Sequence, residues 1–231
     1  ELKTIFPILA RPIRRPEYLV GKYLGTLLTL GVFVAANTGA LLLSLAELSG
    51  RSLALCVLWA FGAALVCAAI GWRLPRTRTW LPIPFSLVLF ASGVVLAAGA
   101  PDDRGVLVGS ALLTLCEVGI VTAVATVFAA FSSPFLTAVF TFGVFVVGRS
   151  ADTLANLPVR MFGETLRAIG QTLGHVVPNL MLYVPERPLL TGEAEGASLL
   201  GYLGLAAAYA AAWVLGLLTF ASLVFRRRDF L

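Results

Sequence analysis

Long apolar runs alternate with short polar breaks along most of the chain. The breaks contain Gly, Pro or charged residues, and they leave six apolar runs at 22–46, 53–72, 80–98, 106–131, 134–149 and 198–225. A helix needs about 20 apolar residues to cross roughly 30 Å of hydrocarbon, and several of these runs exceed that length. The pattern predicts an all-α integral membrane protein, a polytopic helical bundle of about six transmembrane helices.

Composition strengthens this prediction. Hydrophobic residues make up 59% of the chain and charged residues only 13%, whereas soluble domains average about 45–50% apolar and about 25% charged residues. A membrane barrel would show alternating segments of about ten residues, and the continuous apolar run at 206–224 has no such alternation. The composition therefore excludes a water-soluble fold, and the predicted spans are helices.

The distribution of charge predicts the orientation of these spans. Six spans place both ends of the chain on one side, and basic residues strongly outnumber acidic ones in the segments of that side. The basic residues there are Lys3, Arg11, Arg14, Arg15, Lys22, Arg73, Arg76, Arg78, Arg226, Arg227 and Arg228. Acidic residues are in the majority on the other side, so the positive-inside rule places both ends in the cytoplasm. The excess positive charge thus reflects orientation in a membrane, and we expect no nucleic-acid partner.

Phe131-Ser132-Ser133-Pro134 is the least certain boundary between spans. A proline after two serines fits either a tight turn between two helices or a kink within one long helix. About 40 residues lie on each side, too many for one crossing, so we favour the turn.

The one long extramembrane segment covers residues 150–197. Its apolar residues recur at intervals of three to four, which indicates an amphipathic helical stretch: Leu154, Leu157, Met161, Phe162, Leu166, Ile169 and Leu173. We expect this segment to lie at the outer interface, as a structural cap on the helix ends or as a gating element.

Glu117 is the one carboxylate within a predicted span. A charge inside the membrane costs at least roughly 2.5 kcal/mol, so such residues usually face protein or water. Glu117 could line a substrate path, or it could be a neutral or hydrogen-bonded group that fixes helix packing. Asn37 is a weaker candidate for the same two roles, more typical of an interhelical hydrogen bond than of a ligand contact.

No motif for catalysis or for a cofactor is evident. Cys56, Cys67 and Cys116 lie within apolar runs without a CxxC pair, which is typical of buried small hydrophobic residues. The single His175 has no metal-ligand partner at a suitable spacing, and we interpret it as a surface residue. The chain also contains no GxxxxGK[ST] phosphate-binding loop. We therefore expect a protein that is not an enzyme and has no metal or cofactor.

The first 22 residues combine a short amphipathic element, a basic turn with three prolines and the start of the first apolar run. Such a segment lies flat on a membrane surface, where its basic residues pair with anionic lipid and its apolar residues enter the interface or a groove on another protein. From the residues alone, a juxtamembrane anchor and a docking segment both remain open.

The order of residues in this segment resembles a known motif. Leu9-Ala10-Arg11-Pro12, followed by Arg14-Arg15-Pro16-Glu17-Tyr18-Leu19-Val20-Gly21-Lys22, is similar to the cytoplasmic coupling segment of ABC transporter permeases of the ABC-2 exporter superfamily. Pro178-Asn179-Leu180 and the tail at 225–230 are also similar to that family. Two further spans usually precede the segment, and the chain begins at Glu1 without them. We therefore expect an N-terminally incomplete permease.

The resemblance implies a layout and a set of partners. A coupling segment at 1–21 would precede five spans at 22–149, followed by the external segment at 150–197, a last span at 198–225 and a basic tail at 226–231. The implied partners are a cytoplasmic ABC ATPase, a second permease subunit and membrane lipid, in the bacterial inner membrane. Residues implied to couple to the ATPase are Arg11, Arg14, Arg15, Glu17 and Lys22.

The number of spans and the function both leave alternatives open. The family commonly has four spans after the coupling segment rather than six, so the hairpin at 53–98 looks like an insertion. A stand-alone secondary transporter or channel, and a membrane scaffold that docks an ABC ATPase without transport, are the competing hypotheses. A secondary transporter often has related halves and several intramembrane ionisable residues, and neither is visible here.

Overall fold

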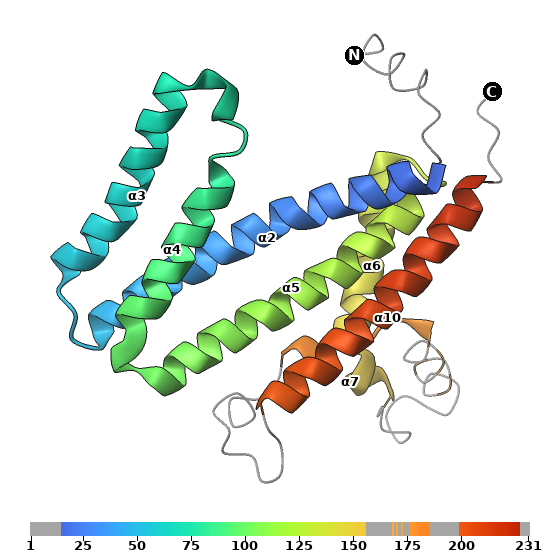
Figure 1. Ribbon diagram of the computed structural model, residues 1–231. Helices are drawn as coiled ribbons and strands as arrows, with labels where there is room; N and C mark the ends of the chain where they lie inside the picture. Colours follow the sequence, from blue (N-terminus) through green and yellow to red (C-terminus); the bar gives the residue numbers. More distant parts are fainter. Residues whose placement is uncertain are drawn as a thin grey trace. The chain divides into compact units, whose positions relative to one another are not determined.

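The computed structural model describes residues 15–155, 168, 170, 172, 176–184 and 199–226. Within these ranges all regular structure is helical and no strand occurs (Figure 1). The elements are α2 (Arg15–Leu48), α3 (Leu53–Arg73), η2 (Pro75–Thr77), α4 (Pro82–Leu96), η3 (Ala97–Gly99), α5 (Pro101–Ala129), α6 (Pro134–Arg149), α7 (Ala151–Ala155), η4 (Met181–Tyr183) and α10 (Leu199–Arg226).

Five helical stretches in the described part of the chain are long and apolar enough to cross a membrane. They are Pro16–Leu48, Leu53–Arg73, Pro82–Gly99, Pro101–Ala129 and Leu199–Val224. The expected run at 134–149 also forms an apolar helix, α6, but its 16 residues extend only about 24 Å. The prediction of a polytopic all-α bundle is therefore confirmed at the level of helices, with one of the six expected spans short.

Helix α2 begins earlier than the sequence analysis placed the first span. The expected boundary was residue 22, whereas the helix starts at Arg15 and runs for 34 residues to Leu48. Pro16 and Glu17 occupy the first turn, where the fixed φ of proline and a negative charge near the positive end of the helix dipole both favour helix. Residues 15–21 thus belong to the same helix as the apolar run that follows.

A short turn separates α2 from α3. Gly50 has a φ of 94°, a conformation that glycine adopts without a steric penalty. The Arg51 N–H donates to the Ala46 carbonyl and the Gly50 N–H to the Glu47 carbonyl, so a Schellman motif ends α2. The Ser52 hydroxyl then accepts from the Leu55 N–H and begins α3.

The chain divides into two compact units, and the divisions fall inside α2, α5 and α10. The first unit contains the described residues within 1–27, 117–182 and 208–231, and the second contains those within 28–116 and 183–207. Each unit has its own set of buried apolar side chains.

In the second unit, α2 and α4 approach closely at two glycines. A Cβ atom on Gly39 would lie 2.7 Å from the Leu89 carbonyl carbon and from the Phe90 nitrogen. A Cβ atom on Gly93 would lie 2.7 Å from the Leu42 Cβ. Glycine at both positions lets the two backbones come together, as small residues do between membrane helices.

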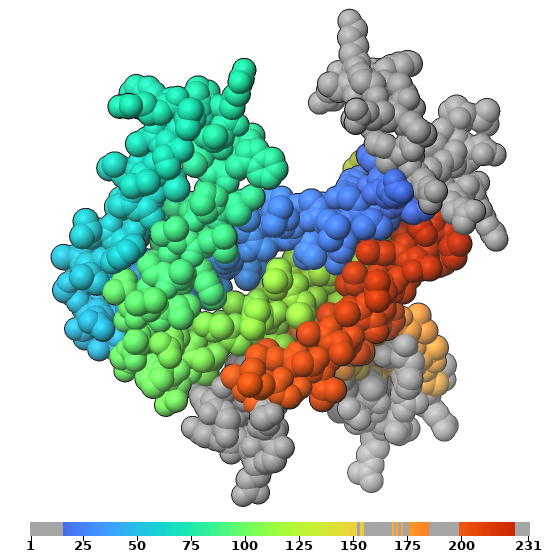
Figure 2. Space-filling view, viewed as in Figure 1, coloured from blue at the N-terminus to red at the C-terminus, as the bar shows by residue number. Residues whose placement is uncertain are grey.

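Beside this crossing lies the apolar cluster of the second unit. Its buried members are Leu42, Ala46, Cys56 and Ala97. Helix α3 contributes Cys56 but is otherwise largely uncovered, with Trp59, Phe61 and Leu65 among its exposed side chains. Figure 1 shows α3 and α4 as an antiparallel hairpin, and the space-filling view in Figure 2 shows α3, in cyan, largely uncovered. An apolar exterior of this kind suits hydrocarbon, since lipid tails are as apolar as leucine.

In the first unit, residues 130–133 separate α5 from α6, which confirms the predicted turn. The Ser133 hydroxyl accepts from the Leu136 N–H and caps α6, with Pro134 at its first position. The Ser132 and Thr137 hydroxyls are 2.8 Å apart, and the Phe128 and Phe140 rings lie with centroids 5.3 Å apart. These contacts fold α6 back along α5.

The amphipathic segment expected at 150–197 is described only in part. Helix α7 holds Leu154, which is half-buried, and Ala151, which is 3% exposed. The other apolar residues of the predicted stretch, from Leu157 to Leu173, lie outside the described residues. Its role as a cap or a gate therefore stays a prediction.

The close approach of α2 and α4 generates a stability prediction. Gly39→Ala should lower the free energy of unfolding by about 2 kcal/mol, because the added methyl meets backbone atoms that cannot rotate away. Gly62→Ala on α3 is the matched control: a Cβ there meets nothing within 4 Å, so stability should be unchanged or rise by up to about 1 kcal/mol through better helix propensity. Denaturant titration in detergent measures the free energy of unfolding of both variants. Equal values would contradict the close approach of α2 and α4 at Gly39.

Candidate functional site

The first turns of α2 carry three of the five residues that the sequence analysis assigned to ATPase coupling: Arg15, Glu17 and Lys22. Arg11 and Arg14 lie outside the described residues, as does the side chain of Arg15. Glu17 and Lys22 are both exposed on the first two turns of the helix. Two of the five assigned side chains are thus placed, and both are accessible to a partner.

The opposite side of these turns is buried in the first unit. Leu19 is 5% exposed and packs in a cluster with Val127 of α5 and Ala221 of α10. One turn further, Tyr23 is 4% exposed and its hydroxyl donates to the Gly119 carbonyl at 3.2 Å. Because Leu19 and Tyr23 are four residues apart, they share one face of the helix. The first turns of α2 are therefore fixed to α5 and α10.

Glu117 forms a bidentate ion pair with Arg149. The Arg149 Nε donates to Glu117 Oε1 at 2.8 Å, and the Arg149 Nη2 donates to Oε2 at 2.9 Å. The Glu117 side chain is 8% exposed and the Arg149 side chain 34% exposed. This paired geometry is the strong form of a charge-assisted hydrogen bond. It supplies the partner that the packing interpretation of Glu117 requires.

The pair joins the two helices far from the turn that connects them. Glu117 lies 12 residues before the end of α5, and Arg149 lies 15 residues after the start of α6. At 1.5 Å per residue these positions are about 18 and 22 Å along their helices. The long arginine side chain spans the small difference, so the hairpin is held at both ends.

Sequence reasoning missed Arg149 because it lies at the end of a span, where a basic residue is ordinarily an interface anchor. The signal was available: counting from the turn in both directions places Glu117 and Arg149 at similar depth. A carboxylate and a guanidinium at matching depth on neighbouring helices predict a pair, since charges within a membrane pair with one another.

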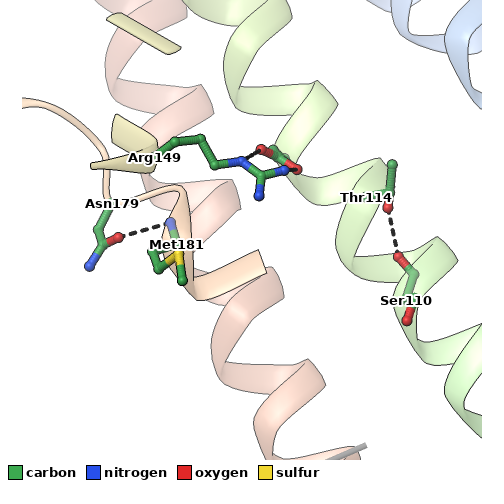
Figure 3. Close-up of polar contacts among 6 residues, drawn as sticks. Ser110, Thr114, Arg149, Asn179 and Met181 are labelled. Carbon is green, nitrogen blue, oxygen red and sulfur yellow. Dashed lines mark hydrogen bonds and ion pairs between the residues drawn. The ribbon is translucent and has the colours of Figure 1, made fainter. Parts of the chain in front are cut away.

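A short non-helical segment packs beside Arg149. The Leu180 N–H donates to the Gly148 carbonyl at 3.0 Å, and a Cβ on Gly148 would lie 2.7 Å from the Pro178 carbonyl oxygen. The Asn179 N–H donates to the Tyr209 hydroxyl of α10 at 2.9 Å. In Figure 3, Arg149 extends toward α5, while Asn179 bonds the Met181 backbone. Residues 178–181 therefore link the end of α6 to α10.

Asn37, the weaker candidate for a substrate path, belongs to the second unit and is exposed. Its neighbour Thr38 is 6% exposed and points to the interior of that unit. The structure does not place a second polar side chain of the candidate set beside Asn37. Its assignment stays a prediction.

The structure also places the residues for which no chemistry was expected. Cys56 is buried, Cys67 and Cys116 are half-buried, and all three thiols are free. Among the described residues, no group of three or more His, Cys, Asp or Glu side chains could hold a metal ion. His175 lies outside the described residues.

Comparison with known proteins gives no relative: no family model, no curated protein and no solved structure matches this chain. The function therefore has to be argued from the residues and their geometry.

The ion pair generates a prediction about packing. Glu117→Gln and Arg149→Gln should each lower the free energy of unfolding by about 3 kcal/mol, at the low end for a buried pair because Arg149 is partly exposed. The double variant should lose less than the sum of the two, by about 1–3 kcal/mol, because each single change already removes the interaction. A double-mutant cycle in detergent measures this difference.

Additive losses would show that the two side chains do not interact. The same variants separate packing from transport: a substrate-path role for Glu117 requires Glu117→Gln to reduce transport more than assembly. Equal losses in both favour the packing role.

Proposed function

We propose that this chain is the permease subunit of an ATP-driven transporter of the ABC-2 exporter kind, energised by a separate cytoplasmic ATPase. The observation that carries the proposal is the combination at the start of α2. The coupling-like residues Glu17 and Lys22 lie on a helix that is anchored at Leu19 and Tyr23. A segment built in this way can receive a force at its exposed face and pass it to the helices behind it.

The mechanism follows from that construction. Two permeases and two ATPase subunits assemble in the bacterial inner membrane, with both ends of this chain in the cytoplasm. Closure of the ATPase on ATP moves residues 1–22. Since Leu19 packs on Val127 and Ala221 and Tyr23 bonds Gly119, movement of these turns displaces α5 and α10 with them. Substrate then passes between the two permeases.

The charge pattern supports the orientation in this proposal. Basic residues lie before the first apolar run, in the 73–79 connection and after the last run. These three segments fall on one side if the 134–149 helix completes six crossings, and basic residues favour the cytoplasmic side. The basic face is then available to a soluble ATPase.

The first test is co-purification of an ATPase with the full native chain in mild detergent. Replacing Arg11, Arg14 and Arg15 together with Ala should remove the bound ATPase while the permease stays monodisperse, because the docking charges are lost. The matched control replaces Arg226, Arg227 and Arg228 with Ala, which removes the same charge from the same predicted side.

Equal loss with both triple variants would indicate non-specific charge attraction. Absence of any ATPase from the unaltered chain would overturn the proposal and move the stand-alone transporter to first place.

A second test separates docking from force transmission. A Cβ on Gly21 meets nothing within 4 Å, so Gly21→Ala is accommodated, whereas Gly21→Pro removes a backbone donor and disturbs the preceding turn of α2. Proline inside a helix costs about 3 kcal/mol and breaks or kinks it. We expect the Gly21→Pro complex to retain the ATPase but to lose permease-dependent stimulation of ATP hydrolysis. Gly21→Ala should retain both.

Stimulation of ATP hydrolysis that is equal in the Gly21→Pro and Gly21→Ala complexes would contradict transmission through a continuous α2.

A further inference from the structure

A cavity of about 200 Å³ lies in the first unit beside the first turns of α2. Tyr18, Lys22 and Thr26 line it from α2, at intervals of four residues that place them in one stripe. Thr122, Ala125, Thr126 and Ala129 line it from α5 at the matching three- and four-residue intervals. The two stripes form a groove, here called the α2–α5 groove. Its threonines and alanines are called the floor, and Tyr18 and Lys22 are called the rim.

The floor of the α2–α5 groove is apolar although it contains several threonines. The Thr26 hydroxyl donates to the Lys22 carbonyl at 3.0 Å, and the Thr126 hydroxyl donates to the Thr122 carbonyl at 2.7 Å. The Thr137 hydroxyl is paired with Ser132 at 2.8 Å. These three hydroxyls are already bonded to their own helix or turn, which makes the lining less polar than its four threonines suggest. The floor therefore suits hydrocarbon rather than a sugar or a free ion.

The rim of the groove is polar and positively charged. Lys22 is exposed and is the only charged residue among the lining residues that the structure describes, and Tyr18 beside it is 53% exposed. Glu17 does not line the cavity. A cationic rim above an apolar floor matches an anionic amphiphile with a hydrocarbon tail.

Size and position identify which amphiphile fits. Pockets that enclose a drug-sized ligand begin at about 300 Å³, so this cavity holds only part of a longer molecule. It extends along α5 from Ala130, at the turn, to Thr122, a length of roughly 10 Å. The groove thus reaches from the end of the α5–α6 hairpin into the apolar part of the helices, the depth range of a phospholipid headgroup and its first methylenes.

We propose that the α2–α5 groove is a binding site for an anionic phospholipid. Its phosphate lies at the Lys22 ammonium and the Tyr18 hydroxyl, and the upper part of one acyl chain lies against Thr26, Thr122 and Ala125. The site uses residues of one unit only and does not depend on which partner drives the protein.

The test measures lipid retained by the full chain. The protein is reconstituted into vesicles of equal parts phosphatidylglycerol and phosphatidylcholine and re-extracted in mild detergent. Bound lipid per chain is then counted by native mass spectrometry. The unaltered chain should retain phosphatidylglycerol in preference to phosphatidylcholine. Lys22→Ala should reduce the affinity for phosphatidylglycerol about fivefold, as expected for one basic residue at a membrane surface, and Lys22→Arg should restore it.

A second variant tests the floor without changing charge. Ala125→Leu fills the groove and should reduce retained lipid of both kinds. The matched controls are Arg76→Ala, which removes an exposed basic residue of the second unit, and Ala64→Leu, which fills a different cavity lined by Ala64 and Phe85. Neither control should change retention. If Ala125→Leu does not yield monodisperse protein, the Lys22→Ala and Lys22→Arg pair still decides the question.

Three results would overturn the proposal. Equal retention of phosphatidylglycerol and phosphatidylcholine by the unaltered chain removes the anionic preference. If the Lys22→Ala variant and the Arg76→Ala control retain equal amounts of phosphatidylglycerol, Lys22 does not bind the lipid phosphate. Loss with Ala64→Leu as large as with Ala125→Leu shows that lipid is retained by the apolar exterior in general.

Discussion

Hydrocarbon offers no water to a polar group, so each backbone and side-chain dipole of a membrane-spanning chain has to find its partner within the protein. The described helices meet this requirement inside themselves. Hydroxyls at Thr26, Ser44 and Thr219 donate to the carbonyl four residues earlier. Among the described buried side-chain N and O atoms, only the Thr141 hydroxyl has no partner. Apolar side chains are then free to face outward, as they do on α3.

The same requirement explains the one buried charge among the described residues of the first unit. An isolated carboxylate at Glu117 would cost several kcal/mol in the membrane, and the Arg149 guanidinium offsets that cost through two hydrogen bonds. The pair also has a mechanical consequence. Because α5 and α6 are joined by the turn at one end and by this pair toward the other, they are expected to move as one body when either is displaced.

The first two turns of α2 bring three roles together. Their buried face, through Leu19 and Tyr23, fixes the helix to its neighbours. Their exposed face carries Glu17 and Lys22, which the sequence associates with a partner. Lys22 also stands at the rim of the α2–α5 groove. In the proposed transporter, a lipid at this groove would therefore lie against the helix that receives the force of the ATPase.

The sequence alone determined the all-α class, the number of apolar helices and the turn at Ser132 and Ser133, because these depend on local composition and on local breaks in apolar periodicity. It began the first span at about residue 22, whereas the helix that contains this span begins at Arg15, since a basic stretch with prolines looks like a loop although Pro16 and Glu17 suit a first turn. Only the tertiary structure decided the partner of Glu117, the glycine crossing of α2 and α4, and the α2–α5 groove. Each of these depends on which helix faces which. A membrane helix is apolar around its whole circumference, so its sequence does not indicate which side contacts a neighbouring helix.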